Sequence, residues 1–291
     1  MSNYFEKFYD DWHQNAQENR IHEIRDRDLM VLNYLKGCDS VFELGVGNGV
    51  ILKMSDAANK AGIDVSKEAI KISEKSINEV YTKSVDLKVL NIDDDELPWE
   101  SRSFDGAMAI EVLEHLFDPV HALSEMNRIL KPNGRLAITV PNIGYYFFRW
   151  YHLKSGEMLD FHGNGMIVNE HIRFYGIKSL KILLEAGGFE IVSIKGCMKK
   201  IVSPQGANSD PLNSSSLKTK DVLRHLKPSL TNIFSKFNWL FKLWKIWPSM
   251  FAVGLVVEAI KITESKYKYN TAIDHQNRSS DEVNGNINSI N

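Results

Sequence analysis

Cysteine is scarce in this 291-residue sequence, which contains only Cys38 and Cys197. The two form neither a close pair nor a cluster with metal-ligand spacing, so the sequence offers no disulfide framework. Long hydrophobic runs are also missing, because the longest apolar stretch, residues 250–257, is far shorter than the ~20 residues that span a bilayer. The N-terminus has no basic segment leading into an apolar stretch, as a secretory signal would have. We therefore expect a cytoplasmic protein.

A charge excess of either sign is absent too. Lysine and arginine number 35 against 37 acidic residues, which gives a net charge of -2 and a pI near 6.5. Such a balance produces no field that attracts polyanions, so nucleic acid is not expected as a partner. A hydrophobic content of 43% is ordinary for a globular chain, and a chain of this length can bury one main core with additions.

Short apolar segments alternate with amphipathic ones through the middle of the chain. Segments typical of strands are residues 40–44, 60–64, 86–91, 104–110 and 135–140, and helical segments are 50–57, 67–80 and 120–130. A further helix and strand are expected at residues 179–186 and 189–194, and a last strand at 250–260. This alternation predicts βαβ units, and therefore an α/β fold with a doubly wound, mostly parallel sheet.

Local signals mark the ends of these segments. Ser66 can cap the helix that follows it, and Asp118 with Pro119 supplies an N-cap followed by proline at the first helical position. Residues 131–134, Lys-Pro-Asn-Gly, predict a turn between the helix before them and the next strand.

The expected organisation has five parts. Residues 1–36 form an N-terminal helical segment, 37–196 the core, 197–249 a basic and aromatic helical insertion, 250–262 the last core strand, and 263–291 a polar tail expected to be disordered.

A glycine-rich turn follows the first strand at residues 43–49, Glu-Leu-Gly-Val-Gly-Asn-Gly. Gly45, Gly47 and Gly49 lack a Cβ, so the backbone there can approach a ligand closely. Taken alone the turn is open to several interpretations, because such turns also bind dinucleotides or serve only as tight turns. A dinucleotide fingerprint requires a third glycine or alanine, and Val50 or Leu52 stands there in the two possible registers.

The second strand ends at Asp64. In a doubly wound fold, a carboxylate at this point accepts hydrogen bonds from ribose hydroxyls. Asp64 therefore favours a nucleoside-containing ligand over a purely structural turn.

These residues give the sequence a resemblance to the class I S-adenosylmethionine (SAM)-dependent methyltransferases, in particular the branch that includes the ubiquinone-pathway O-methyltransferases. The resemblance covers roughly residues 35–194, with a weaker similarity at 250–261. The segments that carry it are residues 43–49, 64, 91–98, 103–105, 110–115, 130–136 and 171–189. One departure is Val46, where many members have a smaller residue.

The resemblance implies a seven-stranded, mostly parallel, Rossmann-like sheet with a helical insertion before its last strand, and SAM as the cofactor. It places Glu43 near the amino group of SAM, Asp64 at the ribose, and Asp93 at the adenine amino group with Asp94 beside it. The other implied cofactor-contacting residues are Gly45, Gly47, Gly49, Val65, Ile110 and Glu111.

Two histidines are candidates for a base or an acceptor contact. His115 follows the fourth strand at the carboxyl edge of the sheet, and His171 precedes the last helix-strand unit of the core. The alternatives are a structural or cofactor-lining role for His115 and local backbone bonding for His171. Glu114 is expected to be solvated or to cap a helix. No metal site is expected, because these histidines show no paired ligand spacing.

Two flanking segments carry further candidates. Asp160 and His162 lie in a glycine-containing stretch that could act as a lid. Tyr9 and Trp12 either close over the cofactor or pack against the core.

We therefore expect methyl transfer from SAM to a small-molecule, glycan or lipid-linked acceptor, at a hydroxyl oxygen. The alternatives are an N- or C-methyltransferase acting on a small metabolite, and a SAM-binding module without catalysis. An oxidoreductase that uses a nicotinamide cofactor ranks last, because the glycine register fails.

The segment 222–247 has no acidic residue but mixes lysine and arginine with phenylalanine and tryptophan. A basic, aromatic, amphipathic segment can lie in a membrane interface. The alternative is a cap helix packed on the sheet, with its lysines simply solvated.

The membrane interpretation predicts that the full chain co-sediments with liposomes and that deletion of residues 222–247 moves the protein into the supernatant. The physical reason is the loss of buried aromatic area and of lysine attraction to anionic lipid. Equal recovery of both proteins in the supernatant would exclude this interpretation.

Overall fold

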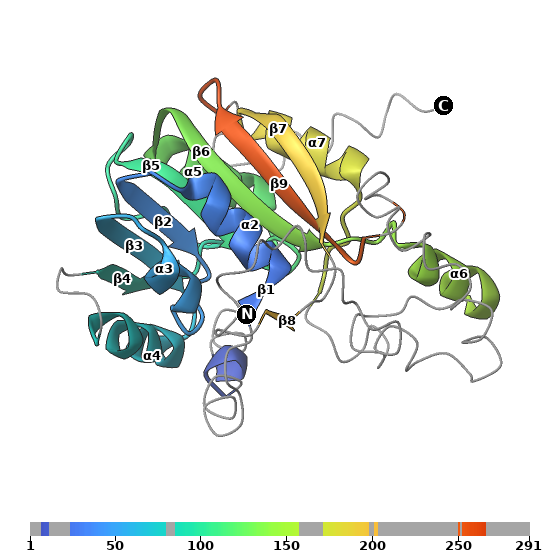
Figure 1. Cartoon of the computed structure of the whole chain (residues 1–291), viewed down its shortest axis with the longest axis horizontal. Helices are drawn as coiled ribbons and strands as arrows, with labels where there is room; N and C mark the ends of the chain where they lie inside the picture. The colour runs from blue at the N-terminus through green and yellow to red at the C-terminus, as the bar shows by residue number, and fades with distance from the viewer. Residues whose placement is uncertain are drawn as a thin grey trace, which may run out of the picture.

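The computed structural model describes residues 7–11, 24–79, 85–156, 171–197, 201–202, 250 and 252–265. Within them a seven-stranded sheet has the order β4-β3-β2-β5-β6-β9-β7 (Figure 1). Its strands are β2 (Ser40–Leu44), β3 (Asn59–Asp64), β4 (Asp86–Val89), β5 (Phe104–Ile110), β6 (Leu130–Pro141), β7 (Phe189–Cys197) and β9 (Gly254–Lys261).

Pairing is parallel from β4 through β6, and β9 runs antiparallel between β6 and β7. The expected α/β fold with a mostly parallel seven-stranded sheet is confirmed. The expected helical insertion lies outside the described residues, apart from the two-residue strand β8 (Ile201–Val202). That strand pairs with β1 (Ile24–Arg25) in a separate antiparallel ribbon.

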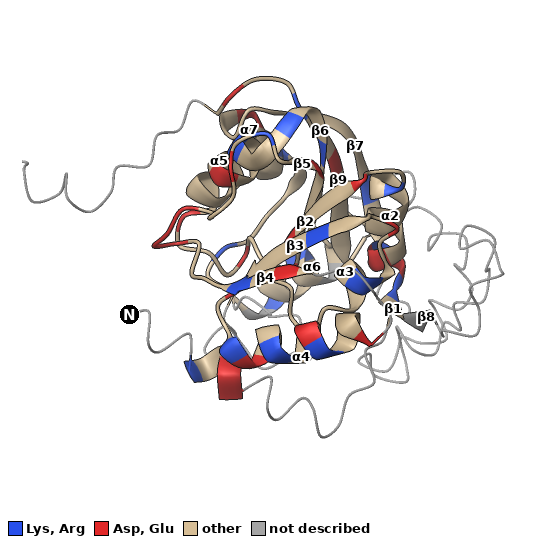
Figure 2. Ribbon diagram, turned by 90° about the vertical axis from the view of Figure 1, so that its left-hand side faces the viewer, with Lys and Arg blue, Asp and Glu red and all other residues tan. Residues whose placement is uncertain are grey.

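Helices cover both faces of the sheet, as Figures 1 and 2 show from two sides. On one face lie α2 (Asp26–Leu35), α3 (Val50–Met54) and α4 (Lys67–Asn78), and on the other α5 (Pro119–Ile129) and α7 (Ile177–Ala186). A further helix, α6 (Tyr146–Ser155), extends away from the sheet (Figure 1). No helix in the described part of the chain is long and apolar enough to cross a membrane.

The predicted helix caps are confirmed. Ser66 accepts a hydrogen bond from the Ala69 N–H, and Asp118 accepts from the two N–H groups after Pro119. The predicted turn at residues 131–134 does not precede the strand, because β6 begins at Leu130; instead these four residues interrupt its pairing with β5, which passes from Phe104–Leu130 to Gly106–Arg135. The register between β5 and β6 shifts there and Asn133 has a φ of 61°, so the glycine and proline signals mark an irregularity within a strand.

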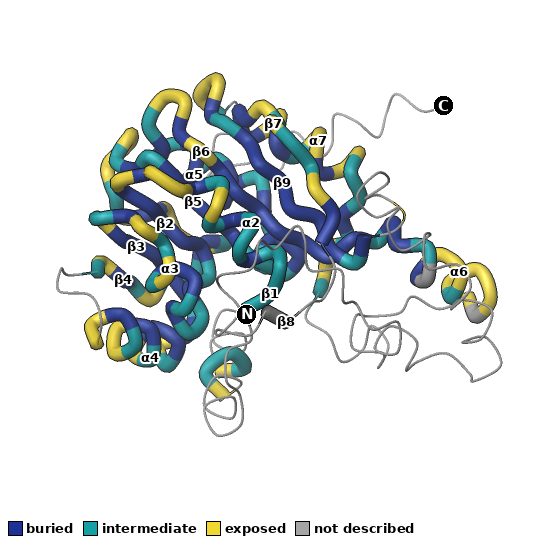
Figure 3. The backbone as a smooth tube through the Cα atoms, in the orientation of Figure 1, coloured by how far each residue is buried: buried dark blue, intermediate teal, exposed yellow. Residues whose placement is uncertain are grey.

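Side chains alternate between two hydrophobic cores on opposite faces of the sheet. Most residues of the central strands are therefore buried, as the dark blue stretches of Figure 3 show. In β2, Phe42 and Leu44 pack in the core on the α5 and α7 side, whereas Val41 packs in the core on the α2 side. The alternation therefore directs Glu43 towards α2.

The strand order reverses direction between β2 and β5, because the chain builds β3 and β4 on one side before crossing to β5. In open α/β sheets such a switch point leaves a crevice at the carboxyl ends of the strands. The segments that follow β2 and β5 therefore meet at one place on the molecule.

Candidate cofactor and acceptor site

The glycine turn after β2 is left-handed at all three of its glycines. Gly45, Gly47 and Gly49 have φ values of 74°, 56° and 74°. A Cβ at Gly45 would stand 2.5 Å from Cγ2 of Val112, and one at Gly49 would stand 2.9 Å from Cβ of Ser73. The left-handed backbone therefore favours glycine at all three positions, and packing within the chain also requires it at Gly45 and Gly49. The sequence by itself indicates only one reason for these glycines, the close approach of a ligand.

The unusual Val46 of the turn is accommodated by a glycine in the neighbouring strand. Val46 is buried, and a Cβ at Gly62 of β3 would lie 2.4 Å from its Cγ2 atom. The extra volume of the branched side chain is thus directed into the sheet and away from the carboxyl edge.

Asp64 supports the turn from the end of β3. Its Oδ2 accepts a hydrogen bond from the Gly47 N–H at 2.8 Å, and its Oδ1 accepts from the Ser66 N–H at 2.9 Å. The carboxylate therefore ties the glycine turn to the start of α4, and Val65 lies between these contacts.

Glu43 is a buried carboxylate at the base of the turn. It is 2% exposed, and its Oε2 atom has no hydrogen-bond partner. Burial raises its pKa well above the usual range, and the nearby carboxylates of Asp28 and Asp64 raise it further. A cationic ligand group next to Glu43 would relieve both effects.

Asp93 connects the turn after β4 to the segment before α5. Its carboxylate accepts hydrogen bonds from the N–H groups of Phe117 and Asp118, at 3.1 and 2.8 Å. The exposed Asp94 accepts a bond from the side-chain amide of Asn91 at 2.6 Å. Both acids thus lie in the segment that follows β4, and their contact with adenine stays a prediction.

The segment after β5 lies directly against the glycine turn, since Val112 occupies the space above Gly45. It begins at Ile110 and Glu111, both partly exposed. Glu111 has a φ of 55°, forms an ion pair with Arg27 at 2.5 Å, and accepts a bond from the Thr139 hydroxyl at 3.0 Å. The two candidate cofactor-lining residues are therefore at the switch point, and Arg27 of α2 is a contact that the sequence did not indicate.

His115 and His171 lie side by side, with ring centroids 4.7 Å apart. Glu114 lies next to both, because its Oε1 is 4.0 Å from Nε2 of His115 and 3.9 Å from Nε2 of His171. We call these three residues the Glu114 cluster. The sequence indicates each histidine separately as a candidate, but it does not predict that the two side chains lie next to each other.

Backbone contacts hold the two histidine segments together. The N–H groups of Ile172 and Arg173 donate to the Glu114 carbonyl at 3.0 and 3.1 Å, and the Tyr175 hydroxyl donates to the Leu113 carbonyl at 3.1 Å. The Arg173 side chain also donates to backbone carbonyls at residues 116 and 117. The position of His171 is therefore fixed by the segment that carries His115.

The prediction for Glu114 is wrong, because this residue is neither solvated nor a cap. It is 1% exposed, and neither carboxylate oxygen has a hydrogen-bond partner. Burial raises its pKa well above the usual range, and the charge of Glu111 adds to the shift. A buried carboxylate without partners is costly, so this residue indicates a site that serves a ligand.

The short helix at residues 7–11 covers the same edge. The Tyr9 ring lies edge-on to the His115 ring, with centroids 6.3 Å apart. Asp10 accepts hydrogen bonds from the Ser66 hydroxyl at 2.6 Å and from the Glu68 N–H at 3.1 Å, at the start of α4. The N-terminal segment thus contacts both the glycine-turn side and the histidine side of the site.

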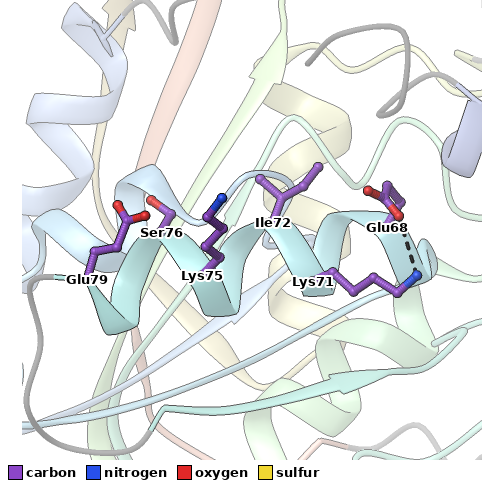
Figure 4. Close-up of a pocket in the computed structure, with 6 residues that line it drawn as sticks. All are labelled: Glu68, Lys71, Ile72, Lys75, Ser76 and Glu79. Atoms are coloured by element: carbon purple, nitrogen blue, oxygen red, sulfur yellow. Dashed lines mark ion pairs between the residues drawn. The ribbon is translucent and has the colours of Figure 1, made fainter. Parts of the chain in front are cut away.

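Several predicted candidates lie outside the described residues: Trp12, Asp160, His162 and the segment 222–247. A separate hollow runs along α4 (Figure 4). Its lining residues come from α4 and the residue that follows it: Glu68, Lys71, Ile72, Lys75, Ser76 and Glu79. Their charges are mixed, and Lys71 pairs with Glu68 at 3.5 Å, so the hollow belongs to the charged outer face of α4 seen in Figure 2.

Residues 42–138 match the methyltransferase domain family. The chain is 36% identical over 110 residues to a 27-O-demethylrifamycin SV methyltransferase of Amycolatopsis mediterranei, covering 36% of this chain and 39% of that enzyme. It is 29% identical over 128 residues to a ubiquinone biosynthesis O-methyltransferase of Thiobacillus denitrificans, covering 42% and 54%. These matches bear out the resemblance to that branch, although the chain spans only about half or less of either enzyme.

A solved structure confirms the fold independently of close sequence similarity. The crystal structure of a methyltransferase-like protein from Bacillus halodurans superposes with a TM-score of 0.51 at 17% identity, covering 82% of this chain and 99% of that one. At this identity the likeness concerns the fold alone. The family match and the relatives agree with this fold, and residues 42–138 therefore form a class I SAM-dependent methyltransferase domain, whose cofactor is S-adenosylmethionine.

Proposed function

We propose that this methyltransferase transfers the methyl group to a hydroxyl oxygen of a small-molecule, glycan or lipid-linked acceptor. The observation that carries the proposal is the Glu114 cluster, which places two imidazoles and a buried carboxylate beside the segment that packs on the glycine turn. A hydroxyl is a weak nucleophile that must lose its proton, whereas an amine or a carboxylate needs less assistance. A polar cluster of this kind is therefore of most use to a hydroxyl acceptor.

SAM supplies a methyl group on a positively charged sulfur that is a good leaving group. The acceptor oxygen forms a bond to the methyl carbon, and the bond from that carbon to sulfur breaks with its electron pair remaining on sulfur. The proton of the hydroxyl passes to an imidazole nitrogen of the Glu114 cluster. The protein mainly has to hold the oxygen and the methyl carbon in line, which is a matter of position more than of covalent chemistry.

The charges around the glycine turn suit this cofactor, which carries a sulfonium and an ammonium group against one carboxylate. Glu43 offers a buried carboxylate oxygen without a partner, and Asp28 and Asp64 are close enough to raise its pKa. We assign Glu43 to the ammonium group, Asp64 to the ribose hydroxyls, and Asp93 with Asp94 to the adenine end. Gly45, Gly47, Gly49, Val65, Ile110 and Glu111 line the same crevice.

The composition of residues 222–247 bears on the acceptor. If this basic and aromatic segment lies at a membrane surface instead of packing on the sheet as a cap, the acceptor is a membrane-associated molecule such as a glycolipid or a prenylated ring. The O-methyltransferases among the relatives are consistent with an oxygen acceptor, although they cover only part of this chain.

His115→Ala and His171→Ala should each lower kcat for a hydroxyl acceptor by about 100-fold or more, because each removes a group that handles the acceptor proton. The Kd for SAM should stay within about twofold of wild type in both variants, since the cofactor contacts lie elsewhere. His152→Ala, an exposed histidine on α6, is the matched control. The assay is label transfer from SAM to paired phenol, sugar and amine acceptors. Transfer to amines with none to any hydroxyl would refute the proposal.

Asp64→Ala should weaken SAM binding at least about tenfold, because each lost hydrogen bond to a charged group contributes roughly 1.5–3 kcal/mol. The loss of the Asp64 bond to the Gly47 N–H also loosens the glycine turn. Calorimetric titration measures the change, with Asp39→Ala at the amino end of β2 as the control on the opposite edge. Wild-type affinity in Asp64→Ala would contradict the ribose assignment.

SAM affinity should fall as the pH is lowered through the raised pKa of Glu43. Below that pKa the free protein holds a proton on Glu43, and the ammonium group of SAM must displace it. Glu43→Gln should bind more weakly than wild type and lose most of this pH dependence. Calorimetry over a pH series tests both points, and the exposed Glu185→Gln on α7 is the control. A wild-type Kd that does not change with pH would argue against this role.

A further inference from the structure

The Glu114 cluster combines three groups that bind metal ions, and they come from two segments that are far apart in the sequence. One ligand atom from each of Glu114, His115 and His171 lies within 4.8 Å of the others. We propose that these residues bind one divalent transition-metal ion, which holds the acceptor oxygen during methyl transfer. This inference rests on the proposed function for its catalytic role, but the ion site itself can be tested separately.

Glu114 provides the observation that points to a cation. Both of its oxygens are buried and have no hydrogen-bond partner, although burying a carboxylate without compensation is costly. Its Oε1 lies almost equally far from Nε2 of His115 and Nε2 of His171, at 4.0 and 3.9 Å. A cation placed among the three would satisfy the carboxylate and use both imidazoles as neutral ligands.

Binding an ion requires the three side chains to draw closer together. Metal bonds of about 2.0–2.2 Å to nitrogen and oxygen imply ligand atoms roughly 3.4 Å apart around a tetrahedral ion. The two histidine-to-carboxylate distances would have to shorten by about half an ångström, and the distance between the two histidine ligand atoms, which lie within 4.8 Å of each other, by up to about 1.4 Å. The bonds from Ile172 and Arg173 to the Glu114 carbonyl already hold the two segments together.

The ligand set indicates the class of ion. Two imidazoles and one carboxylate suit zinc, iron, cobalt or manganese, whereas magnesium and calcium prefer oxygen ligands alone. Glu111 is the next carboxylate along the chain, but Arg27 and Thr139 bind its two oxygens. Three protein ligands leave at least one coordination position open, as catalytic metal sites do.

The open position explains how the cluster would act on a hydroxyl. The ion would lower the pKa of an acceptor hydroxyl bound at that position, so that the hydroxyl could lose its proton to water. With the ion bound, His115 and His171 would hold the ion instead of taking the proton themselves. The sequence predicts no metal site, because the spacing of these histidines along the chain is not that of paired metal ligands. The fold nevertheless brings the three side chains together.

Cobalt chloride titration of the tag-free, chelator-treated protein tests the site without SAM or an acceptor. Wild type should bind one Co²⁺ per chain, with visible absorption bands of nitrogen and oxygen coordination. Glu114→Gln and His171→Ala should each weaken Co²⁺ binding at least about tenfold, because even partners of metal ligands change affinity by roughly 10- to 100-fold. Glu185→Gln and His152→Ala are matched controls at exposed positions and should bind like wild type.

Unchanged Co²⁺ affinity in both cluster variants, or no Co²⁺ binding by wild type, would overturn the inference. Thermal unfolding by circular dichroism shows which variants are folded, and His115→Ala replaces any variant that is not. Methyl transfer to a hydroxyl acceptor that persists at full rate after chelation would also overturn it while leaving the proposed function intact. Conversely, Co²⁺ binding in a protein that methylates only amines would retain the ion site and reject the proposed function.

Discussion

The parallel pairing of β2 with β5 is the constraint on which the rest of the site depends. The two strands are neighbours in the sheet although β3 and β4 separate them in the sequence. Their carboxyl ends therefore deliver the glycine turn and residues 111–118 to one place. The contact of Gly45 with Val112 makes this junction tight, and it sets how far the acceptor-side residues lie from the cofactor-side residues.

Buried acidic groups give this junction its electrostatic character. Glu43 and Glu114 both have carboxylate oxygens without partners, and burial raises the pKa of each. Such groups reduce the stability of the free protein, because a charge removed from water is costly unless it is paired. Their presence on the two sides of the switch point is understandable if each meets a positive charge when the site is filled: the ammonium group at Glu43 and the proposed ion at Glu114.

Prediction succeeded where local chemistry decides the structure. The bounds of β2 and β5 agree with the expected segments, and Ser66 and Asp118 cap the helices that they were expected to cap. It misplaced the turn at residues 131–134, which interrupts the pairing of β6 with β5 instead of preceding the strand. The pairing of Phe104 with Leu130, before the turn signals, is a tertiary contact that local sequence signals do not report.

By itself the sequence determined the fold class and the cofactor. The hydrophobic periodicity, the helix caps and the glycine turn are properties of residues close together along the chain. Asp64 is the last residue of β3, and Asp93 lies in the turn after β4. Only the tertiary structure brought His171 against His115 and buried Glu114 between them, through backbone bonds from residues 172 and 173 to the Glu114 carbonyl. A contact between distant segments depends on the path of the whole chain, so spacing in the sequence carries no record of it.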